Sequence, residues 1–160
     1  AGIVIIIGII NYFRKKTFLN ISIKESLFLA LSLATTPGLI INSFLKEFSG
    51  RARPSQIDIF GGDKIFSPAY MFSNQCESNC SFASGHASFA FWLTALAMIA
   101  PLKYQKKLFV FFIIIGVLVS FTRIVQGGHF LSDVVFAGMI SLFVNFMIYK
   151  LIYKKDFIIL

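Results

Sequence analysis

Hydrophobic residues gather in long runs along this chain, and polar residues gather in the segments between them. The four longest runs cover residues 26–45, 87–102, 108–122 and 130–149. A helix needs about 20 apolar residues to cross the roughly 30 Å hydrocarbon core of a bilayer, and the two shorter runs approach that length with their flanking residues or in a locally thinner bilayer. The pattern therefore predicts four membrane-spanning helices.

A fifth apolar run opens the chain at residues 1–10. No Met and no cationic segment precede it, so it lacks the layout of a signal peptide. We interpret it as the end of a helix that begins outside the sequence. Because no repeat, low-complexity tract or linker divides the chain, we expect one all-α domain over residues 1–160, a polytopic membrane helix bundle.

The composition agrees with a membrane protein. Of the 160 residues, 57% are hydrophobic and 14% are charged, which is too little polar surface for a soluble globule. Ten of the fifteen Lys and Arg residues lie on one side of the membrane if the predicted spans alternate in direction. These are Arg14, Lys15, Lys16, Lys24, Lys103, Lys106, Lys107, Lys150, Lys154 and Lys155. By the positive-inside rule that side is cytoplasmic, so the net charge of +8 reflects topology and no nucleic-acid partner is expected.

The remaining cations fall on the opposite side, together with both histidines, His86 and His129. These cations are Lys46, Arg51, Arg53, Lys64 and Arg123. The topology rule would keep this side poor in cations, so their presence needs another reason. The longest polar segment, the non-cytoplasmic loop at residues 46–85, carries several of them.

The same loop holds both cysteines, Cys76 and Cys80. Outside the cytoplasm the environment is oxidising, and three intervening residues allow a small loop to close, so a disulfide is favoured. Reduced, buried thiols are the alternative. A zinc pair fits less well, because the chain offers only two histidines as further ligands, and we expect no metal.

Three of the outer cations, Lys46, Arg53 and Arg123, lie in separate segments at membrane boundaries. If these cations come together near the low-dielectric core of the membrane, they repel one another unless an anion lies between them. Phosphate satisfies that need, because arginine presents a planar fork to two phosphate oxygens and lysine adds a point charge. Alternatively each cation snorkels to the lipid headgroups on its own.

Polar residues at the starts of two apolar runs complete the candidate site. Ser84 and Gly85 precede a helix whose first backbone N–H groups and dipole favour an anion, although a simple helix cap explains the serine equally well. His129 and Asp133 are four residues apart, on one face of a helix, so the carboxylate can hold one ring nitrogen as N–H and leave the other as a nucleophile. His86 would then be the general acid.

Together these residues form three short motifs, "KEFSGRARP" (46–54), "ASGH" (83–86) and "TRIVQGGHFLSD" (122–133). They resemble the signature of the type 2 phosphatidic acid phosphatase (PAP2) superfamily, Lys-x6-Arg-Pro, Pro-Ser-Gly-His and Ser-Arg-x5-His-x3-Asp. Ala83 stands where the family has proline, and Thr122 where it has serine. Neither change removes a catalytic atom.

The resemblance implies a six-helix membrane fold, of which this chain would lack the first helix and part of the second. It also implies a cofactor-free phosphatase in which His129 is the nucleophile, Asp133 orients it and His86 is the acid. The phosphate-binding residues it implies are Lys46, Arg53, Ser84, Gly85 and Arg123. The loop from Phe60 to His86 is similar to bacterial members that act on lipid A, with Arg51 and Lys64 either contacting further headgroup charge or solvated.

We therefore expect a multi-pass protein of the bacterial inner membrane whose site faces the periplasm and acts on a phosphorylated lipid. Three other functions fit the same motifs: a phosphatase for polyprenyl diphosphate or phosphatidylglycerol phosphate, a lipid phosphotransferase, and an inactive lipid-binding subunit. Retention of both histidines argues against the inactive subunit. A vanadate-dependent peroxidase would be soluble and is excluded by the hydropathy. The sequence leaves the oligomeric state open.

Overall fold

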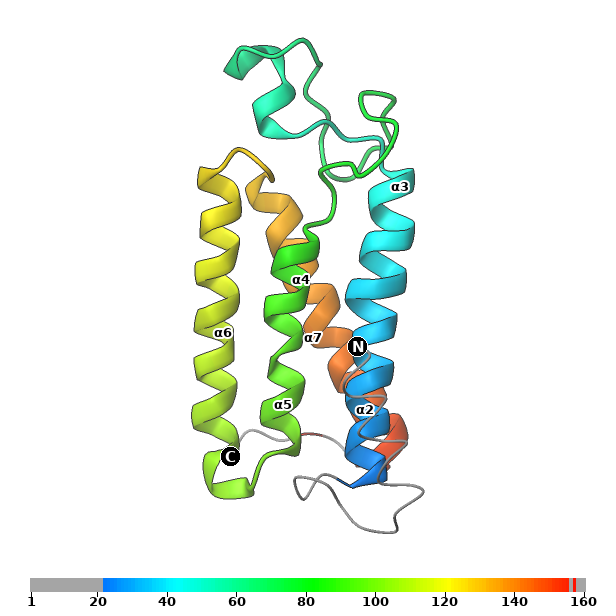
Figure 1. The fold of residues 1–160 in the computed structure, drawn as a ribbon, viewed down its shortest axis with the longest axis vertical. Coiled ribbons are helices and arrows are strands. Elements are labelled where there is room, and N and C mark those ends of the chain that lie inside the picture. Colours follow the sequence, from blue (N-terminus) through cyan, green and yellow to red (C-terminus); the bar gives the residue numbers. More distant parts are fainter. Residues whose placement is uncertain (1–21, 156, 158–160) are drawn as a thin grey trace.

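The computed structural model describes residues 22–155 and 157. Within them the chain is helical and forms no strand, apart from one isolated bridge between Ile57 and Lys64. Figure 1 shows the long helices standing side by side, with the long polar loop at one end of the bundle. The predicted all-α membrane helix bundle is confirmed. The run at residues 1–10 and the cations at positions 14–16 lie outside the described residues.

The first long helical segment of the bundle places Lys46 near one end of the molecule. It consists of α2 (Ile23–Leu33), the π-helical η2 (Ala34–Leu45) and α3 (Lys46–Phe48). Ser22 and Glu25 cap its start reciprocally, since each side chain accepts the other's backbone N–H. Within η2, Pro37 has no N–H to donate, and the helix there is wound more widely than an α-helix.

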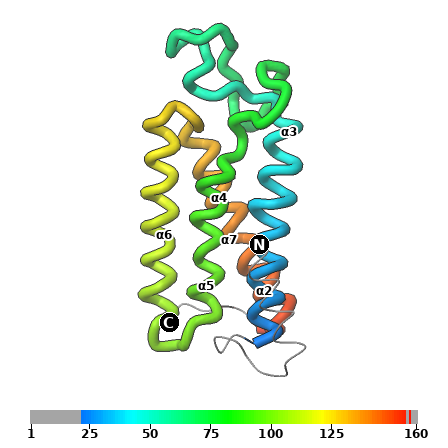
Figure 2. The backbone as a smooth tube through the Cα atoms, viewed as in Figure 1, coloured from blue at the N-terminus to red at the C-terminus, as the bar shows by residue number. Residues whose placement is uncertain are grey.

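The remaining helices follow the polar loop. A short 3-10 turn, η3 (Pro54–Gln56), and a second, η4 (Asp58–Phe60), lie within this loop. After it come α4 (Gly85–Trp92), α5 (Thr94–Ile99), α6 (Leu102–Val125) and α7 (Leu131–Tyr153). Figure 2 shows α4 and α5 running one after the other through the bundle, where α4 contacts η2, α6 and α7.

Three of the four predicted spans are helices long and apolar enough to cross a membrane: Ile23–Phe48, Leu102–Val125 and Leu131–Tyr153. The run predicted at 87–102 forms the shorter apolar segment Gly85–Ile99, which is interrupted at Leu93 and ends before Pro101. The predicted cytoplasmic turn is also shorter than expected. Lys103, Lys106 and Lys107 lie in the first turns of α6, because Pro101 starts that helix directly.

Phe91 is the side chain that sets the spacing between α4 and its two long neighbours. A Cβ atom at Gly116 of α6 would lie 2.5 Å from Cδ1 of the Phe91 ring, and one at Gly138 of α7 would lie 2.9 Å from Cε2. The ring is therefore held between two helix surfaces that have no side chain at that point. This close packing fixes the depth at which α4 enters the bundle, and so the position of its first residues.

Buried polar side chains join the same helices. The Ser88 and Ser141 hydroxyls are 3.0 Å apart between α4 and α7, and Asn145 donates to the Trp92 carbonyl oxygen at 3.2 Å. By contrast α6 exposes a row of large apolar side chains along its length, including Phe111, Ile114 and Phe121. In a membrane, such a surface contacts lipid.

Substituting Gly116 with alanine tests the packing of Phe91. Overpacking of a filled core costs about 1–3 kcal/mol, whereas an alanine in a helix gains about 1 kcal/mol over glycine. Gly38→Ala provides the matched control, because its Cβ would meet only the Leu33 carbonyl oxygen at an ordinary 3.5 Å. We expect Gly116→Ala to be the less stable of the two by the overpacking cost, measured by thermal unfolding in detergent. Equal stability of the two variants would contradict this packing.

Candidate active site

The three sequence motifs meet at one end of the bundle, where the polar loop covers the starts of α4 and α7 (Figure 1). Backbone hydrogen bonds join them directly. The Ser81 N–H donates to the Arg51 carbonyl oxygen at 2.8 Å, and the Ser84 N–H donates to the Asp133 carbonyl oxygen at 3.2 Å. Segments that are up to 82 residues apart in sequence therefore form one site.

His129 is buried, with 1% of its surface exposed, in the turn before α7. Its Nδ1 atom lies 2.7 Å from the backbone carbonyl oxygen of Ser81. A carbonyl oxygen can only accept a hydrogen bond, so Nδ1 carries the proton of the neutral ring and Nε2 carries the lone pair. The ring is thus fixed in the tautomer that a nucleophilic histidine needs.

Asp133 lies in the first turn of α7, but His129 precedes that helix, so the two residues do not share one helix face as predicted. The carboxylate also does not hold the ring directly. The distance from its Oδ2 to Nδ1 of His129 is 3.8 Å, too long for a hydrogen bond. The carboxylate instead accepts hydrogen bonds from the Ser81 hydroxyl at 2.5 Å and from the Phe130 N–H at 2.9 Å, and it pairs with Arg51. Ser81 thus lies between the two residues, with its hydroxyl on the Asp133 carboxylate and its carbonyl oxygen on the His129 ring.

Arg51 is part of this buried network, which corrects the expectation that it is solvated or contacts a lipid headgroup. Its side chain is 3% exposed; Nη1 contacts Asp133 and donates to the Ser132 hydroxyl at 2.8 Å, while Nε donates to the Ser67 carbonyl oxygen at 2.7 Å. The guanidinium also lies 4.2 Å from the centre of the Phe130 ring. Arg51 therefore neutralises the charge of Asp133 inside the protein.

The other three motif cations, Lys46, Arg53 and Arg123, lie within electrostatic range of His86. Lys46 Nζ donates to Asn79 Oδ1 at 3.0 Å, and Arg53 Nη2 donates to the Asn79 backbone oxygen at 3.0 Å. Arg123 Nη1 contacts Gln126, while its buried Nε has no hydrogen-bond partner among the described residues. Both Lys46 and His86 are within electrostatic range of Arg53 and Arg123.

His86 lies in the first turn of α4, outside the three long membrane-crossing helices. Partial burial lowers the pKa of its imidazole below the ordinary value of 6.5, and the nearby charges of Arg123, Lys46, His129 and Arg53 lower it further. Each of these neighbours is cationic or becomes so on protonation, which disfavours a second positive charge on His86. An anion bound among them would reverse this effect.

Ser84 and Gly85 occupy the start of α4. Ser84 is fully buried and caps the helix, with its hydroxyl oxygen accepting from the Ala87 N–H at 3.4 Å. At Gly85 the close neighbour is Asn42 of η2, whose Oδ1 would lie 2.6 Å from an added Cβ. The absence of a side chain at Gly85 therefore lets η2 approach the start of α4.

A cavity of about 490 Å³ opens beside this helix start. Lys46, Gly85 and His86 line it together with apolar residues of α4 and α6, among them Phe89, Leu93 and Val119. The cavity thus joins a cationic region to an apolar one.

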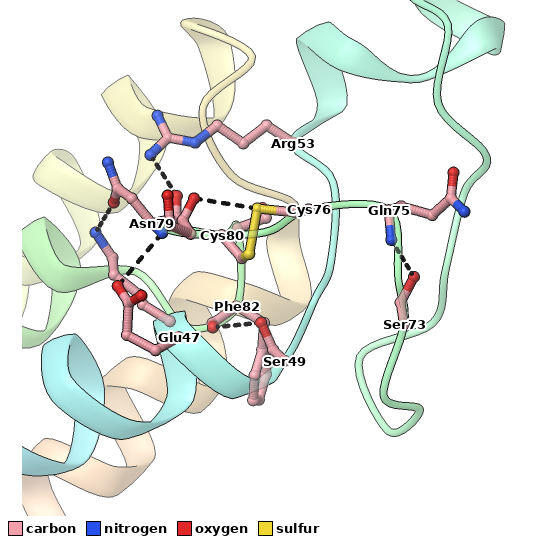
Figure 3. The surroundings of a disulfide bond; sticks show 12 residues. Glu47, Ser49, Arg53, Ser73, Gln75, Cys76, Asn79, Cys80 and Phe82 are labelled. Carbon is pink, nitrogen blue, oxygen red and sulfur yellow. Dashed lines mark hydrogen bonds between the residues drawn. A yellow bond between two sulfur atoms is a disulfide. The ribbon is translucent and has the colours of Figure 1, made fainter.

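The structure joins Cys76 and Cys80 by a disulfide bond, with their Cα atoms 5.7 Å apart. Figure 3 shows this bridge beside Asn79, which lies between Arg53 and Glu47. Sequence reasoning did not identify Asn79, because an asparagine in a polar loop carries no distinguishing pattern. It also missed Asn42, which could have been found, because a polar residue in an apolar run one helical turn before Lys46 shares a helix face with it.

Comparison with known proteins identifies the family. The model of the PAP2 superfamily matches residues 25–157, so the chain belongs to that superfamily. Its relatives include proteins named lipid A 4'-phosphatase. The one from Francisella tularensis subsp. novicida is 41% identical over 82% of this chain and 60% of its own length, and the one from Rhizobium leguminosarum is 41% identical over 71% of this chain and 48% of its own length.

A third relative, phosphatidylglycerophosphatase B of Bacillus subtilis, is 28% identical over 91% of this chain and 64% of its own length. The chain thus spans about half to two thirds of the length of these relatives. No solved structure matches it.

Removing Arg51 tests the buried pair with Asp133. Arg51→Ala leaves a buried carboxylate without its countercharge, which costs about 3–5 kcal/mol. Lys64→Ala is the matched control from the same loop, because the Lys64 side chain is 45% exposed and its amine is 3.9 Å from Asp63. An exposed pair of that kind contributes about 0–1 kcal/mol. We expect a large fall of the unfolding temperature in detergent for Arg51→Ala alone; similar, small changes in both variants would contradict a buried pair.

Proposed function

We propose that this protein is a lipid phosphatase of the bacterial inner membrane that removes phosphate from lipid A at the periplasmic face, through a phosphohistidine and without a metal ion. The observation that supports this most directly is the position of His129. Its Nδ1 is held by the Ser81 carbonyl oxygen, and His86 and three cations lie within electrostatic range of one another beside it. A nucleophile, a proton donor and a site for phosphate are thereby close to one another.

In the proposed reaction, Nε2 of His129 attacks the phosphorus atom and forms an N–P bond as the bond from phosphorus to the lipid oxygen breaks. His86 gives its proton to that oxygen, which leaves as the lipid alcohol. Water then attacks the phosphorus atom of the phosphohistidine, the N–P bond breaks with its electron pair returning to Nε2 of His129, and His86 takes one proton from the water. The products are inorganic phosphate, the lipid alcohol and the enzyme in its starting state.

The cations would stabilise the charge on the transferring phosphoryl group. Phosphoryl transfer depends mainly on positioning and charge stabilisation, which Lys46, Arg53 and Arg123 can supply. Arg123 contributes a buried Nε that is without a partner among the described residues, a donor suited to a phosphate oxygen. Backbone N–H groups at the start of α4 add a further favourable dipole.

The cavity beside α4 supports a lipid as the substrate. A phosphate at Lys46 and His86 would place an attached acyl chain against Phe89, Leu93 and Val119, toward the membrane interior. The names of two relatives suggest lipid A, and the outward-facing cations of the sequence suggest the periplasmic side. A lipid could then reach the site sideways from the outer leaflet.

A second candidate is a phosphatase for phosphatidylglycerol phosphate, which the third relative's name suggests. Both candidates use the same motif residues, so a substrate panel separates them. Phosphate release should be compared for lipid A, phosphatidylglycerol phosphate, polyprenyl diphosphate and phosphatidic acid, using the full-length protein in detergent. Transfer of labelled phosphate to a second lipid would instead indicate a phosphotransferase.

Replacing the histidines separates their roles. His129→Ala should lower phosphate release about a thousandfold or more, with or without EDTA, because no nucleophile remains. His86→Ala should also be inactive on lipid phosphates, but it should release a burst of p-nitrophenol from p-nitrophenyl phosphate, because that leaving group needs no proton and only the hydrolysis of the phosphohistidine still lacks its base. Retained turnover in His129→Ala, or an equal burst from both variants, would refute these assignments.

The pKa of His86 gives an independent test. In the free protein, NMR titration should place it below 6.5, because burial and the surrounding cations disfavour the charged ring. The protonated acid is present below this pKa and is lost as the pH rises through it. Vanadate or inorganic phosphate adds negative charge beside the ring and should shift the titration to higher pH. An unchanged midpoint with bound anion would contradict a shared pocket.

A further inference from the structure

Two cations of the site are held by one loop residue to which no role has been assigned. Asn79 accepts a hydrogen bond from Lys46 through its side-chain Oδ1, and from Arg53 through its backbone oxygen, both at 3.0 Å. Lys46 belongs to α3 and Arg53 to the loop that follows it, and their positive charges repel each other. Asn79 is therefore the point at which their positions are coupled (Figure 3).

Asn79 is itself firmly placed. It lies between the two cysteines of the disulfide, and the adjacent Cys80 is fully buried and donates its N–H to the Lys46 carbonyl oxygen at 3.0 Å. The Asn79 N–H also contacts Glu47 at 3.4 Å. Its backbone has a φ of 49°, in the left-handed region that asparagine and glycine adopt most readily. The loop geometry thus selects asparagine by conformation as well as by its acceptor.

A neutral acceptor suits this position. An amide oxygen orients the Lys46 ammonium without cancelling its charge, so the positive potential remains available to an anion. Lys46 has three N–H donors and Arg53 has five, and each uses one on Asn79. The remaining donors can bind phosphate oxygens while Asn79 holds the two side chains in place.

We propose that Asn79 is a positioning residue that holds Lys46 and Arg53 in the arrangement that binds phosphate, and that the Cys76–Cys80 disulfide keeps Asn79 in place. This inference rests on the proposed function and extends it. It makes phosphate affinity dependent on the disulfide. Reduction by dithiothreitol, which is oxidised to its cyclic disulfide as two thiols form, frees the loop that carries both acceptor oxygens.

The first test uses Asn79→Gly in the full-length protein, because glycine tolerates the positive φ and removes only the side-chain acceptor. We expect KM and the inhibition constant of inorganic phosphate to rise about tenfold each, the equivalent of one charge-assisted hydrogen bond, with kcat changed much less. Asn74→Gly is the control, because Asn74 is an exposed residue of the same loop whose side-chain oxygen accepts a hydrogen bond from Gln75. A merely structural defect would not change KM and phosphate inhibition selectively.

The second test concerns the disulfide. Dithiothreitol should raise the KM of the wild-type protein at least as much as Asn79→Gly does, since it also releases the acceptor for Arg53. It should have no effect on a folded Cys76→Ser, Cys80→Ser double variant, which should already show the raised KM. If that double variant fails to fold, comparing the KM of the wild-type protein with and without dithiothreitol still tests whether the disulfide is needed.

The outcomes separate this inference from the proposed function. If the wild-type protein releases phosphate and Asn79→Gly has an unchanged or lower phosphate inhibition constant, the role of Asn79 is refuted, and the phosphatase assignment stands. If the wild-type protein releases no phosphate from any lipid, the proposed function fails. Calorimetric binding of vanadate then still tests Asn79: weaker binding by Asn79→Gly supports it, and equal binding overturns it.

Discussion

The site depends on one buried charge, the carboxylate of Asp133. Removing such a group from water costs several kcal/mol unless it is paired and fully hydrogen-bonded. Here the pairing comes from Arg51, and the hydrogen bonds come from Ser81 and from the N–H of Phe130. These partners belong to all the segments that form the site, so the charge is stabilised only when the segments close together. The same closure brings the Ser81 carbonyl oxygen to His129.

The two arginines of the Gly-Arg-Ala-Arg segment illustrate how charge is divided between structure and chemistry. In an ideal strand, the side chains of residues two apart point to the same side. This segment is irregular, and its arginines have separate surroundings: Arg51 is buried against Asp133, while Arg53 reaches Asn79 at the loop surface. One cation neutralises a fixed anion inside the protein. The other is proposed, together with Lys46 and Arg123, to bind an anion from outside.

Much of the architecture could be predicted from the sequence, because the hydrophobic runs are a direct consequence of burial in a membrane. The expectation that His129 and Asp133 share a helix face was wrong, since α7 begins after His129. Three features could not be predicted. The partner of His129 is a backbone carbonyl, which leaves no trace in a residue pattern. The burial of Arg51 depends on how the loop folds over α7, and the role of Asn79 depends on a local backbone turn. The start of α6 also differs from the prediction. The lysines after Pro101 were expected to lie in a turn, but α6 begins at Leu102, directly after that proline.

The central claim is that Arg51 and Asp133 stabilise each other as a buried pair that holds the site together. A double-mutant cycle with Arg51→Met, Asp133→Asn and the combined variant measures this directly through the free energy of unfolding in detergent. We predict that the double variant loses about 1–3 kcal/mol less than the sum of the two single losses, because removing both partners leaves no uncompensated charge. Additive losses would show that the two residues act independently and would contradict the account.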